Sequence, residues 1–130
     1  MGEVLEPSGR ALYYRPVGGQ IDFAETSENA LRREIIEELN VEIESPMLLG
    51  VLENLFEVDG KQGHEVVFVY DAQLRDKSLY AVERLSGLES DGRVFSAVWI
   101  ELRNVGPDTP AIYPTGLVDM LRKLSDKDSR

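Results

Sequence analysis

The sequence predicts one α/β domain with a mixed β-sheet, and three observations support that fold class. The 130 residues are about the length of one ordinary domain. Hydrophobic residues make up 42% of the chain and charged residues 29%, which is typical of a globular protein and argues against disorder. Segments with strand-like patterning are mixed with two segments whose apolar residues recur at helical spacing. No repeat or linker divides the chain, so residues 1–130 are expected to form a single domain.

Two helices are predicted from their apolar spacing and their end signals. The first runs from Glu28 to Leu39, after a capping residue that is either Thr26 or Ser27. Asn40 follows its last turn, where a residue that adopts left-handed backbone angles is favoured. The second helix covers about residues 115–124, in which leucines lie three or four positions apart: Leu117, Leu121 and Leu124.

Strand-like patterning occurs in four segments. The short aromatic run Ala11–Pro16 leads into a Gly-Gly pair and predicts a strand that ends in a loop. Two β-rich runs, Met47–Val58 and Glu65–Leu74, flank an Asp-Gly turn and predict a long hairpin. Phe95–Leu102 alternates around its apolar residues and predicts a later strand. The polar, glycine-punctuated stretch Arg75–Arg93 is expected to be an irregular connection.

The charge and the residue types present argue against several classes of protein. Acidic residues outnumber basic residues 24 to 14, giving a formal net charge of −10, whereas a protein that coats nucleic acid or an anionic membrane needs a basic face. The chain has no cysteine, which excludes disulfides and thiolate chemistry, and its one histidine, His64, excludes a multi-histidine metal site. No apolar run is long enough to span a bilayer, and the N-terminus lacks a signal-peptide pattern, so a cytoplasmic location is expected.

An acidic cluster lies on the first predicted helix and its flanks. Residues 25–44 hold seven acids and two bases. Glu34, Glu37 and Glu38 fall within one arc of about 100° on that helix, and like charges at these spacings destabilise a helix by roughly 0.2–0.5 kcal/mol per pair. A divalent cation would supply the counter-charge, and oxygen ligands without nearby histidine or cysteine favour Mg²⁺ or Mn²⁺. For the three glutamates alone, the alternative interpretation is a solvated acidic face.

The spacing around this cluster resembles a known sequence motif. Gly19, five residues, Glu25, seven residues and then Arg33–Val41 are similar to the Nudix box, Gly-x5-Glu-x7-Arg-Glu-U-x-Glu-Glu-x-Gly-U, where U is apolar. The box spans residues 19–41 and departs at one position, because Asn40 stands where the family has glycine. Asn is the next best residue for a left-handed helix end. On this resemblance the chain is identified as a member of the Nudix (MutT-like) hydrolase family, which implies a Nudix-type α/β/α sandwich.

The resemblance implies an enzyme and assigns roles to the residues of the box. It implies a Mg²⁺-dependent pyrophosphohydrolase (with Mn²⁺ as the other candidate ion) that cleaves a nucleoside diphosphate linked to another moiety, by attack of water on phosphorus. Glu34 and Glu38 would be the main metal ligands. Glu37 and the Gly18 backbone carbonyl would complete the metal set. Arg33 would act in catalysis by holding the glutamates through charge-assisted hydrogen bonds; the alternative is a simple pair between Arg33 and Glu37.

Other matched positions would have structural or substrate-binding roles. Glu25 would brace the loop before the helix, or would serve only as a favourable partner for the helix N-terminus. Gly19 and Asn40 are the structural positions of the box. Tyr14 and Arg15, with Gly19, are the expected substrate contacts, since an aromatic ring can stack on a base and a guanidinium can hold phosphate. A packing role is the alternative for the tyrosine.

The general base is less specified by the motif, because in this family it is either a box glutamate or an acid on a later loop. Glu89 is the candidate that we place among the catalytic residues, and Asp91 and Glu65 are the other candidates. For each of these acids a solvated surface position is the alternative. His64 is expected at a hairpin end, and Trp99 is expected in the core.

Two other functions remain as alternatives at this stage. A Nudix fold can serve as a non-catalytic module that binds or senses a nucleotide or sugar-nucleotide; all the charged positions of the box are present here, which favours the enzyme. The other alternative is an acidic metal-binding or scaffold protein without a nucleotide role. In either case the composition predicts neither a nucleic-acid nor a membrane partner.

The segment before the box is short for the family. Only 17 residues precede Gly18, so the N-terminal strands are expected to be shortened or missing. Strands without partners invite another chain. A homodimer is therefore expected, with Ala11–Arg15 and Met47–Val58 as its pairing elements. The alternative is a monomer in which residues 1–7 fold back over the gap.

Overall fold

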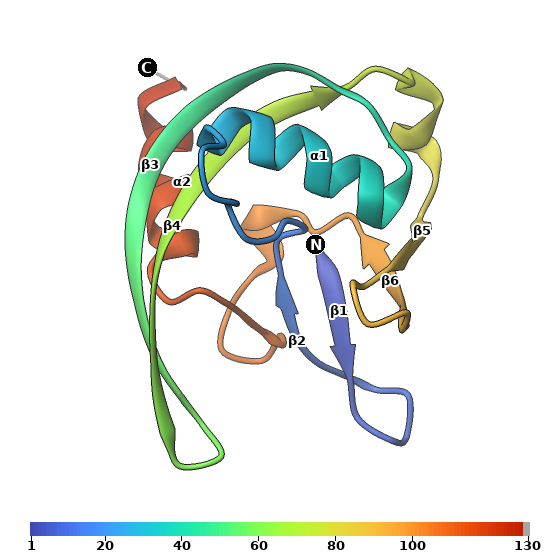
Figure 1. Ribbon diagram of the computed structural model, residues 1–130. Coiled ribbons are helices and arrows are strands. Elements are labelled where there is room, and N and C mark those ends of the chain that lie inside the picture. Colours follow the sequence, from blue (N-terminus) through green and yellow to red (C-terminus); the bar gives the residue numbers. More distant parts are fainter. Residues whose placement is uncertain (129–130) are drawn as a thin grey trace.

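Two β-sheets, two α-helices and two short 3₁₀ helices make up the computed structural model, which describes residues 1–128 (Figure 1). One sheet has five strands in the order β5-β6-β1-β2-β7, and the other is a two-stranded hairpin of β3 and β4. The strand β2 pairs in parallel with β7, while the other pairs are antiparallel, so the larger sheet is mixed. The α/β fold class with a mixed sheet is confirmed. The strands of the larger sheet are β1 (Gly2–Leu5), β2 (Ala11–Arg15), β5 (Arg84–Leu88), β6 (Val94–Val98) and β7 (Ala111–Ile112).

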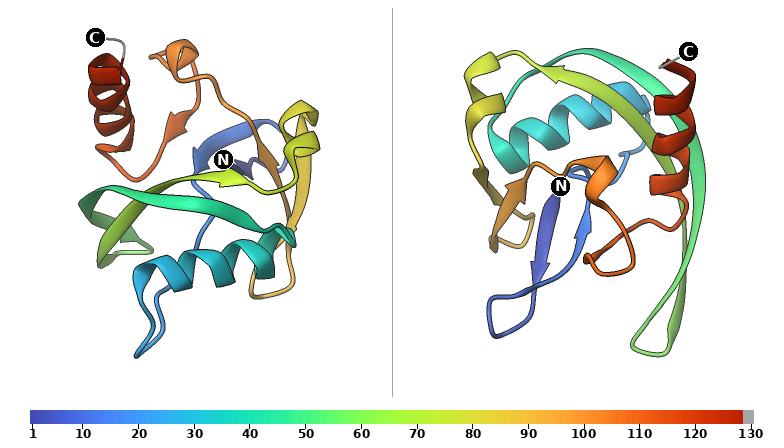
Figure 2. Two further views of the ribbon diagram at one scale, coloured as in Figure 1. Left: turned by 90° about the horizontal axis from the view of Figure 1, so that it is seen from above. Right: turned by 180° about the vertical axis from the view of Figure 1, so that it is seen from behind.

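The long hairpin consists of β3 (Ile43–Val58) and β4 (Lys61–Leu74), and it separates the two helices. Figure 2 shows α1 (Ser27–Leu39) and α2 (Leu117–Asp128) on opposite sides of this hairpin. The turn between the strands has positive φ angles at Asp59 (52°) and Gly60 (77°), as an Asp-Gly hairpin turn requires. Both strands begin before the predicted residues and end at them, because the cross-strand pairing extends to Ile43–Leu74 at one end and Val58–Lys61 at the other.

The helix α1 begins and ends where its sequence predicts. Thr26 is the N-cap, and its hydroxyl oxygen accepts a hydrogen bond from the Asn29 N–H at 3.2 Å. Asn40 adopts left-handed angles (φ 55°, ψ 41°), and its N–H donates to the Ile36 carbonyl at 2.9 Å. Both ends of the helix are therefore fixed by local hydrogen bonds.

The core forms on the inner face of α1 and beneath α2. Ile35 packs with Val41 and Ile43 as one buried cluster. On the other side of the hairpin, Leu117 of α2 is almost fully buried. Gly50 of β3 makes room for α2, because a Cβ at this position would lie 2.7 Å from the Met120 Cε. The partly buried side chains that surround the first cluster are Val17, Leu31, Leu39, Ala72, Leu74 and Leu79.

Three strands of the larger sheet were not predicted. The stretch 75–93, expected to be irregular, contains the short 3₁₀ helix η1 (Lys77–Ala81) and the strand β5. Gly87 reads as a strand breaker in the sequence, but it is required here because the Phe95 ring fills the space of a side chain, 2.4 Å from an added Cβ. The strands β1 and β7 are only four and two residues long, too short for a periodic signal.

Two further expectations are wrong in detail. The strand predicted over Phe95–Leu102 ends at Val98, and the 3₁₀ helix η2 (Leu102–Asn104) follows it. Ala11–Arg15 is not an open edge, because it pairs with β1 on one side and β7 on the other. Within residues 1–128, no helix is both long and apolar enough to cross a membrane.

We predict that Ala24→Gly stabilises the fold. Ala24 is exposed and has a φ of 67°, a left-handed conformation that costs a residue with a Cβ roughly 1–2 kcal/mol. Glycine removes this strain, but it also makes the unfolded chain more flexible, which lowers stability. The net gain in unfolding free energy is therefore expected to be about 0.5 kcal/mol. Urea unfolding measures the change. The control Ala24→Val should destabilise the fold, and a loss of stability in Ala24→Gly would contradict the prediction.

Candidate active site

The Arg33 guanidinium connects the residues of the predicted motif. Its Nε and Nη2 donate to the two carboxylate oxygens of Glu25 at 2.7 and 2.9 Å. Its Nη1 donates to Glu34 at 2.8 Å and to Glu37 at 3.2 Å. Nη2 also donates to the Gln20 backbone carbonyl at 2.9 Å. One side chain thus joins the loop before α1 to two successive turns of the helix.

The loop between Gly19 and α1 is folded against Arg33 by Glu25. The Glu25 carboxylate also accepts the Asp22 N–H at 3.0 Å, and Asp22 itself lies 3.5 Å from Arg33. These contacts, the Arg33 hydrogen bonds first and the Asp22 N–H second, lower the pKa of Glu25 from 4.5 to about 2. The same carboxylates raise the pKa of Arg33. Glu25 therefore acts as more than a partner for the helix N-terminus.

Glu38 lies in a different electrostatic environment from Glu25. Its pKa is raised, first by partial burial and then by the neighbouring carboxylates of Glu34 and Glu89. Arg15 and a hydrogen bond from the Gly18 backbone act in the opposite direction but do not offset these effects. Glu34, Glu38 and Glu89 thus share one region in which negative charge is incompletely neutralised.

Gly19 leaves no room for a side chain beside Glu34. A Cβ at this position would lie 2.2 Å from the Glu34 Cδ and 2.3 Å from one of its carboxylate oxygens, far below van der Waals contact. Any other residue at position 19 would displace the Glu34 carboxylate. By contrast, a Cβ at Gly18 would meet nothing within 4 Å, and the Gly18 backbone contact that the structure provides is directed to Glu38.

Glu89 is brought to this region by the end of β5. Arg15 Nη2, at the end of β2, donates to Glu89 Oε1 at 3.2 Å, and Arg93 lies 3.3 Å from the other oxygen. The backbone N–H of Glu89 donates to the Arg93 carbonyl at 2.8 Å, closing the turn between β5 and β6. The contact between Arg15 and Glu89 joins residues 74 positions apart.

The other candidate bases are engaged elsewhere. Asp91 pairs with Arg93 at 2.6 Å, and hydrogen bonding by the Arg93 backbone lowers its pKa. Glu65 is exposed on β4 and accepts from the Asn54 side chain at 2.8 Å. His64 lies on the same strand, 3.3 Å from Glu53. Of the candidates from sequence, Glu89 is the acid that influences Glu38.

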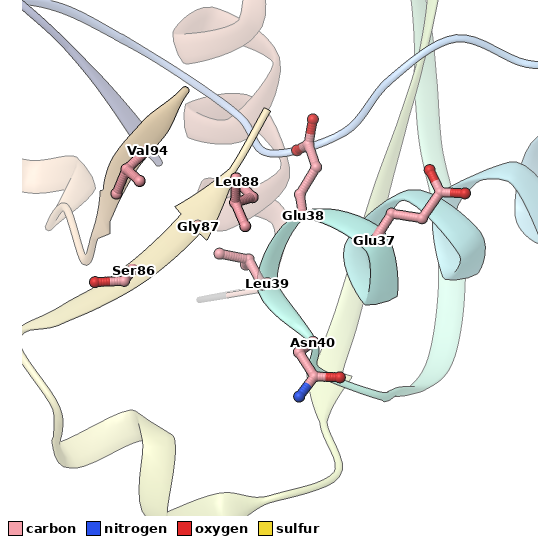
Figure 3. Close-up of a pocket in the computed structure, with 8 residues that line it drawn as sticks. All are labelled: Glu37, Glu38, Leu39, Asn40, Ser86, Gly87, Leu88 and Val94. Carbon is pink, nitrogen blue, oxygen red and sulfur yellow. The ribbon is translucent and has the colours of Figure 1, made fainter. Parts of the chain in front are cut away.

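A cavity of about 230 Å³ adjoins the C-terminal end of α1 (Figure 3). Figure 3 shows the Glu37 and Glu38 side chains diverging from the helix, with Leu39 and Leu88 between the helix and β5. The β5–β6 side of the cavity was missed by sequence reasoning, because the strand that carries it was not predicted. The lining residues are Glu37, Glu38, Leu39, Asn40, Ser86, Gly87, Leu88 and Val94.

The aromatic residues occupy positions that the sequence did not settle. Tyr14 and Arg15 are consecutive on β2, so their side chains project from opposite faces of the sheet. Trp99 was expected in the core, but it is half exposed and stacks on Tyr80 with ring centroids 5.2 Å apart. Its indole N–H donates to the Leu79 carbonyl at 3.3 Å. The expectation for Trp99 is therefore wrong.

The fit of the acidic cluster to a divalent cation depends on how close its carboxylates lie and on their donor type. In the part of the chain that the structure describes, no three His, Cys, Asp or Glu side chains lie close enough together to hold a metal ion. The donor types nevertheless fit Mg²⁺ or Mn²⁺, because the groups are carboxylates and Glu38 has a pKa raised by partial burial and then by acidic neighbours. The pairing of Arg33 with Glu34 and Glu37 occupies oxygens of these two carboxylates.

We predict that Glu25 stabilises the fold in a pH-dependent way. Since its pKa is about 2 in the folded chain and 4.5 ordinarily, this contribution is complete above pH 4.5 and is lost as the pH falls toward 2. Glu25→Gln should be less stable than the natural chain at pH 7, and the difference in unfolding free energy should shrink between pH 4.5 and 2. Urea unfolding across this range measures it. In an Arg33→Gln background the difference should largely vanish, and an equal difference at pH 2 and pH 7 would refute the prediction.

Comparison with known proteins identifies the family. A family model described as NUDIX domain matches residues 6–118. Neither the comparison with curated proteins nor the comparison with solved structures gave a match. The matched residues cover most of the chain, including the loop, helix and strands that position Arg33, Glu34 and Glu38. The chain belongs to the Nudix family.

Proposed function

We propose that the chain is a Mg²⁺-dependent pyrophosphohydrolase that cleaves a nucleoside diphosphate linked to another moiety, with Mn²⁺ as the alternative ion. The observation that carries this proposal is the division of the acidic cluster. Arg33 engages Glu25, Glu34 and Glu37, whereas partial burial and the charges of Glu34 and Glu89 raise the pKa of Glu38. A site with excess negative charge next to a rigid ion-pair network suits a cation that binds a diphosphate.

Glu34 and Glu38 would hold the ion, one helical turn apart on α1, with Glu37 and the Gly18 carbonyl as further ligands. Bound Mg²⁺ would offset the charge of the diphosphate, polarise its P–O bonds and lower the pKa of water. Gly19 keeps the space beside the Glu34 carboxylate free of a side chain. Arg33 orients Glu34 and Glu37, and Asn40 ends the helix directly after them.

Glu89 is the proposed general base. Its charge raises the pKa of Glu38, and its carboxylate is oriented by Arg15 at 3.2 Å and Arg93 at 3.3 Å. In this position it would accept a proton from the attacking water. Arg15 has an exposed guanidinium beside the acids and would contact a phosphate oxygen of the substrate. Tyr14, on the other face of β2, is the weaker candidate for a substrate contact.

We predict that Glu38→Gln abolishes Mg²⁺-dependent hydrolysis, with a loss of at least about 10²-fold in turnover. The assay is phosphate release from a panel of nucleoside diphosphate derivatives with Mg²⁺, compared with EDTA. The matched control is Glu28→Gln, which changes an exposed acid in the first turn of the same helix and should retain activity. The fold should persist in Glu38→Gln, because the substitution removes a repulsion. Near-normal turnover in Glu38→Gln would contradict the ligand assignment. A natural chain that binds the nucleotides without hydrolysing them would favour a binding module.

We also predict that millimolar MgCl₂ raises the melting temperature, whereas NaCl at equal ionic strength does not. A ligand that binds only the folded state stabilises it by RT ln(1 + [L]/Kd). The measurement is thermal unfolding followed by circular dichroism, without substrate. Glu38→Gln should lose most of the Mg²⁺-specific shift. Equal shifts with both salts would indicate general screening of the −10 net charge instead of a site.

A further inference from the structure

The carboxylate of Glu89 lies between two arginines, one facing each of its oxygens. Arg15 Nη2 donates to Glu89 Oε1 at 3.2 Å, and Arg93 Nη2 lies 3.3 Å from Glu89 Oε2. The side chains of Arg15 and Arg93 are 55% and 77% exposed, whereas that of Glu89 is 26% exposed. Solvent access therefore does not decide which arginine a substrate phosphate would take. The other contacts of each arginine do.

Arg93 is fixed to the turn that carries Glu89. One oxygen of the Asp91 carboxylate accepts the Arg93 backbone N–H at 3.0 Å, and the other accepts the Arg93 Nε at 2.6 Å. The backbone hydrogen bond from Arg93 is the main cause that lowers the pKa of Asp91. The Glu89 N–H donates to the Arg93 carbonyl at 2.8 Å, and the Gly92 N–H donates to the Glu89 carbonyl at 2.9 Å. Arg93 and Glu89 are therefore parts of one closed turn and keep their relative position.

Arg15 is attached to Glu89 by a single contact. It projects from the end of β2, outside the turn, and within residues 1–128 Glu89 is the one acid that forms an ion pair with its guanidinium. An exposed ion pair of this kind is weak, whereas a guanidinium binds two phosphate oxygens at once in a strong, planar arrangement. Arg15 therefore loses little when it exchanges Glu89 for a phosphate.

We propose that Arg93, anchored by Asp91, positions Glu89 for catalysis, and that Arg15 leaves Glu89 for a phosphate of the bound substrate. This inference rests on the proposed hydrolase function. The departure of Arg15 uncovers Glu89 Oε1, while Arg93 continues to hold Oε2. The uncovered oxygen accepts one proton of the attacking water, and the water oxygen bonds to phosphorus. The bond from phosphorus to the bridging oxygen breaks, and its electron pair leaves with that oxygen. Arg93 is a positioning residue, because it acts through Glu89.

The first test separates the effect of each arginine on turnover from its effect on substrate binding. The assay is Mg²⁺-dependent hydrolysis of the nucleoside diphosphate derivative that the natural chain cleaves fastest in the panel. Arg93→Ala should lower kcat at least about tenfold and change KM less than about twofold, because the base is misplaced while the phosphate contact remains. Arg15→Ala should raise KM at least about fivefold, because it removes that contact. Arg93→Lys should recover part of kcat, since an ammonium group can hold one acid but cannot reproduce the planar fork.

The matched control is Arg103→Ala. The Arg103 Nε donates at 2.8 Å to the carboxylate of Glu101, two positions earlier, just as the Arg93 Nε donates to Asp91. The Arg103 side chain is also exposed, so this variant should keep the natural kcat and KM. In a Glu89→Gln background, Arg93→Ala should change kcat less than about twofold, because the base that Arg93 positions is already lost. A merely structural role would lower kcat by the same factor in both backgrounds.

The second test requires no turnover. The probe is methylene diphosphonate, a diphosphate mimic that is not hydrolysed, and its binding in the presence of Mg²⁺ is measured by isothermal titration calorimetry. Arg15→Ala should weaken binding at least about fivefold, whereas Arg93→Ala should weaken it less than about twofold, because Arg93 stays with Glu89. Far-UV circular dichroism checks that each variant is folded.

Any of three results would overturn the inference and leave the hydrolase function intact. The first is a near-natural kcat in Arg93→Ala. The second is an equal loss of kcat from Arg93→Ala in the natural and Glu89→Gln chains. The third is diphosphonate binding that depends on Arg93 and not on Arg15. A natural chain that hydrolyses none of the nucleotides in Mg²⁺ would instead overturn the proposed function, and this inference with it.

Discussion

The arrangement of the candidate site depends on the guanidinium group of Arg33. Its planar fork donates in fixed directions, so it sets the orientation of every carboxylate that it binds. Through Glu25 it fixes the loop that begins at Gly19, and through Glu34 and Glu37 it fixes the acidic side of α1. A lysine would supply the same charge as a single point, and it could not hold two sides of this network at once.

This network divides the acidic cluster into two parts with different properties. Glu25 is paired with Arg33, which lowers its pKa to about 2, so it stays ionised where an ordinary glutamate is already protonated, and this suits a structural brace. Glu38 is partly buried near other acids, so it is more easily protonated, and this environment agrees with its proposed role as a metal ligand. Glu25 and Glu38 have the same side chain, so their pKa values differ because their surroundings differ.

The local parts of the structure could be predicted from sequence, and the long-range parts could not. Thr26, Asn40 and the spacing of the glutamates define α1 because capping and helical periodicity act within a few residues. The strand β5 was missed because Gly87 is a strand residue only when the Phe95 ring covers it. The roles of the box residues remain proposals. The family resemblance could name Glu89 as a candidate base. Its contact with Arg15 could not be predicted, because it depends on the pairing among β1, β2, β5 and β6.

The C-terminal end of α1 has a further consequence for how the sequence can change. The peptide dipoles of a helix place partial negative charge at this end, where cations are favoured by about 0.3–1 kcal/mol each. The last turn of α1 has no basic residue, and it carries Glu37 and Glu38 instead. Lysine in place of Glu38 would make a better helix, because it would also face Glu34 one turn earlier. Selection for thermostability alone would therefore drive position 38 away from an acid, and a chain optimised in this way would become more stable as the proposed metal site lost one of its ligands.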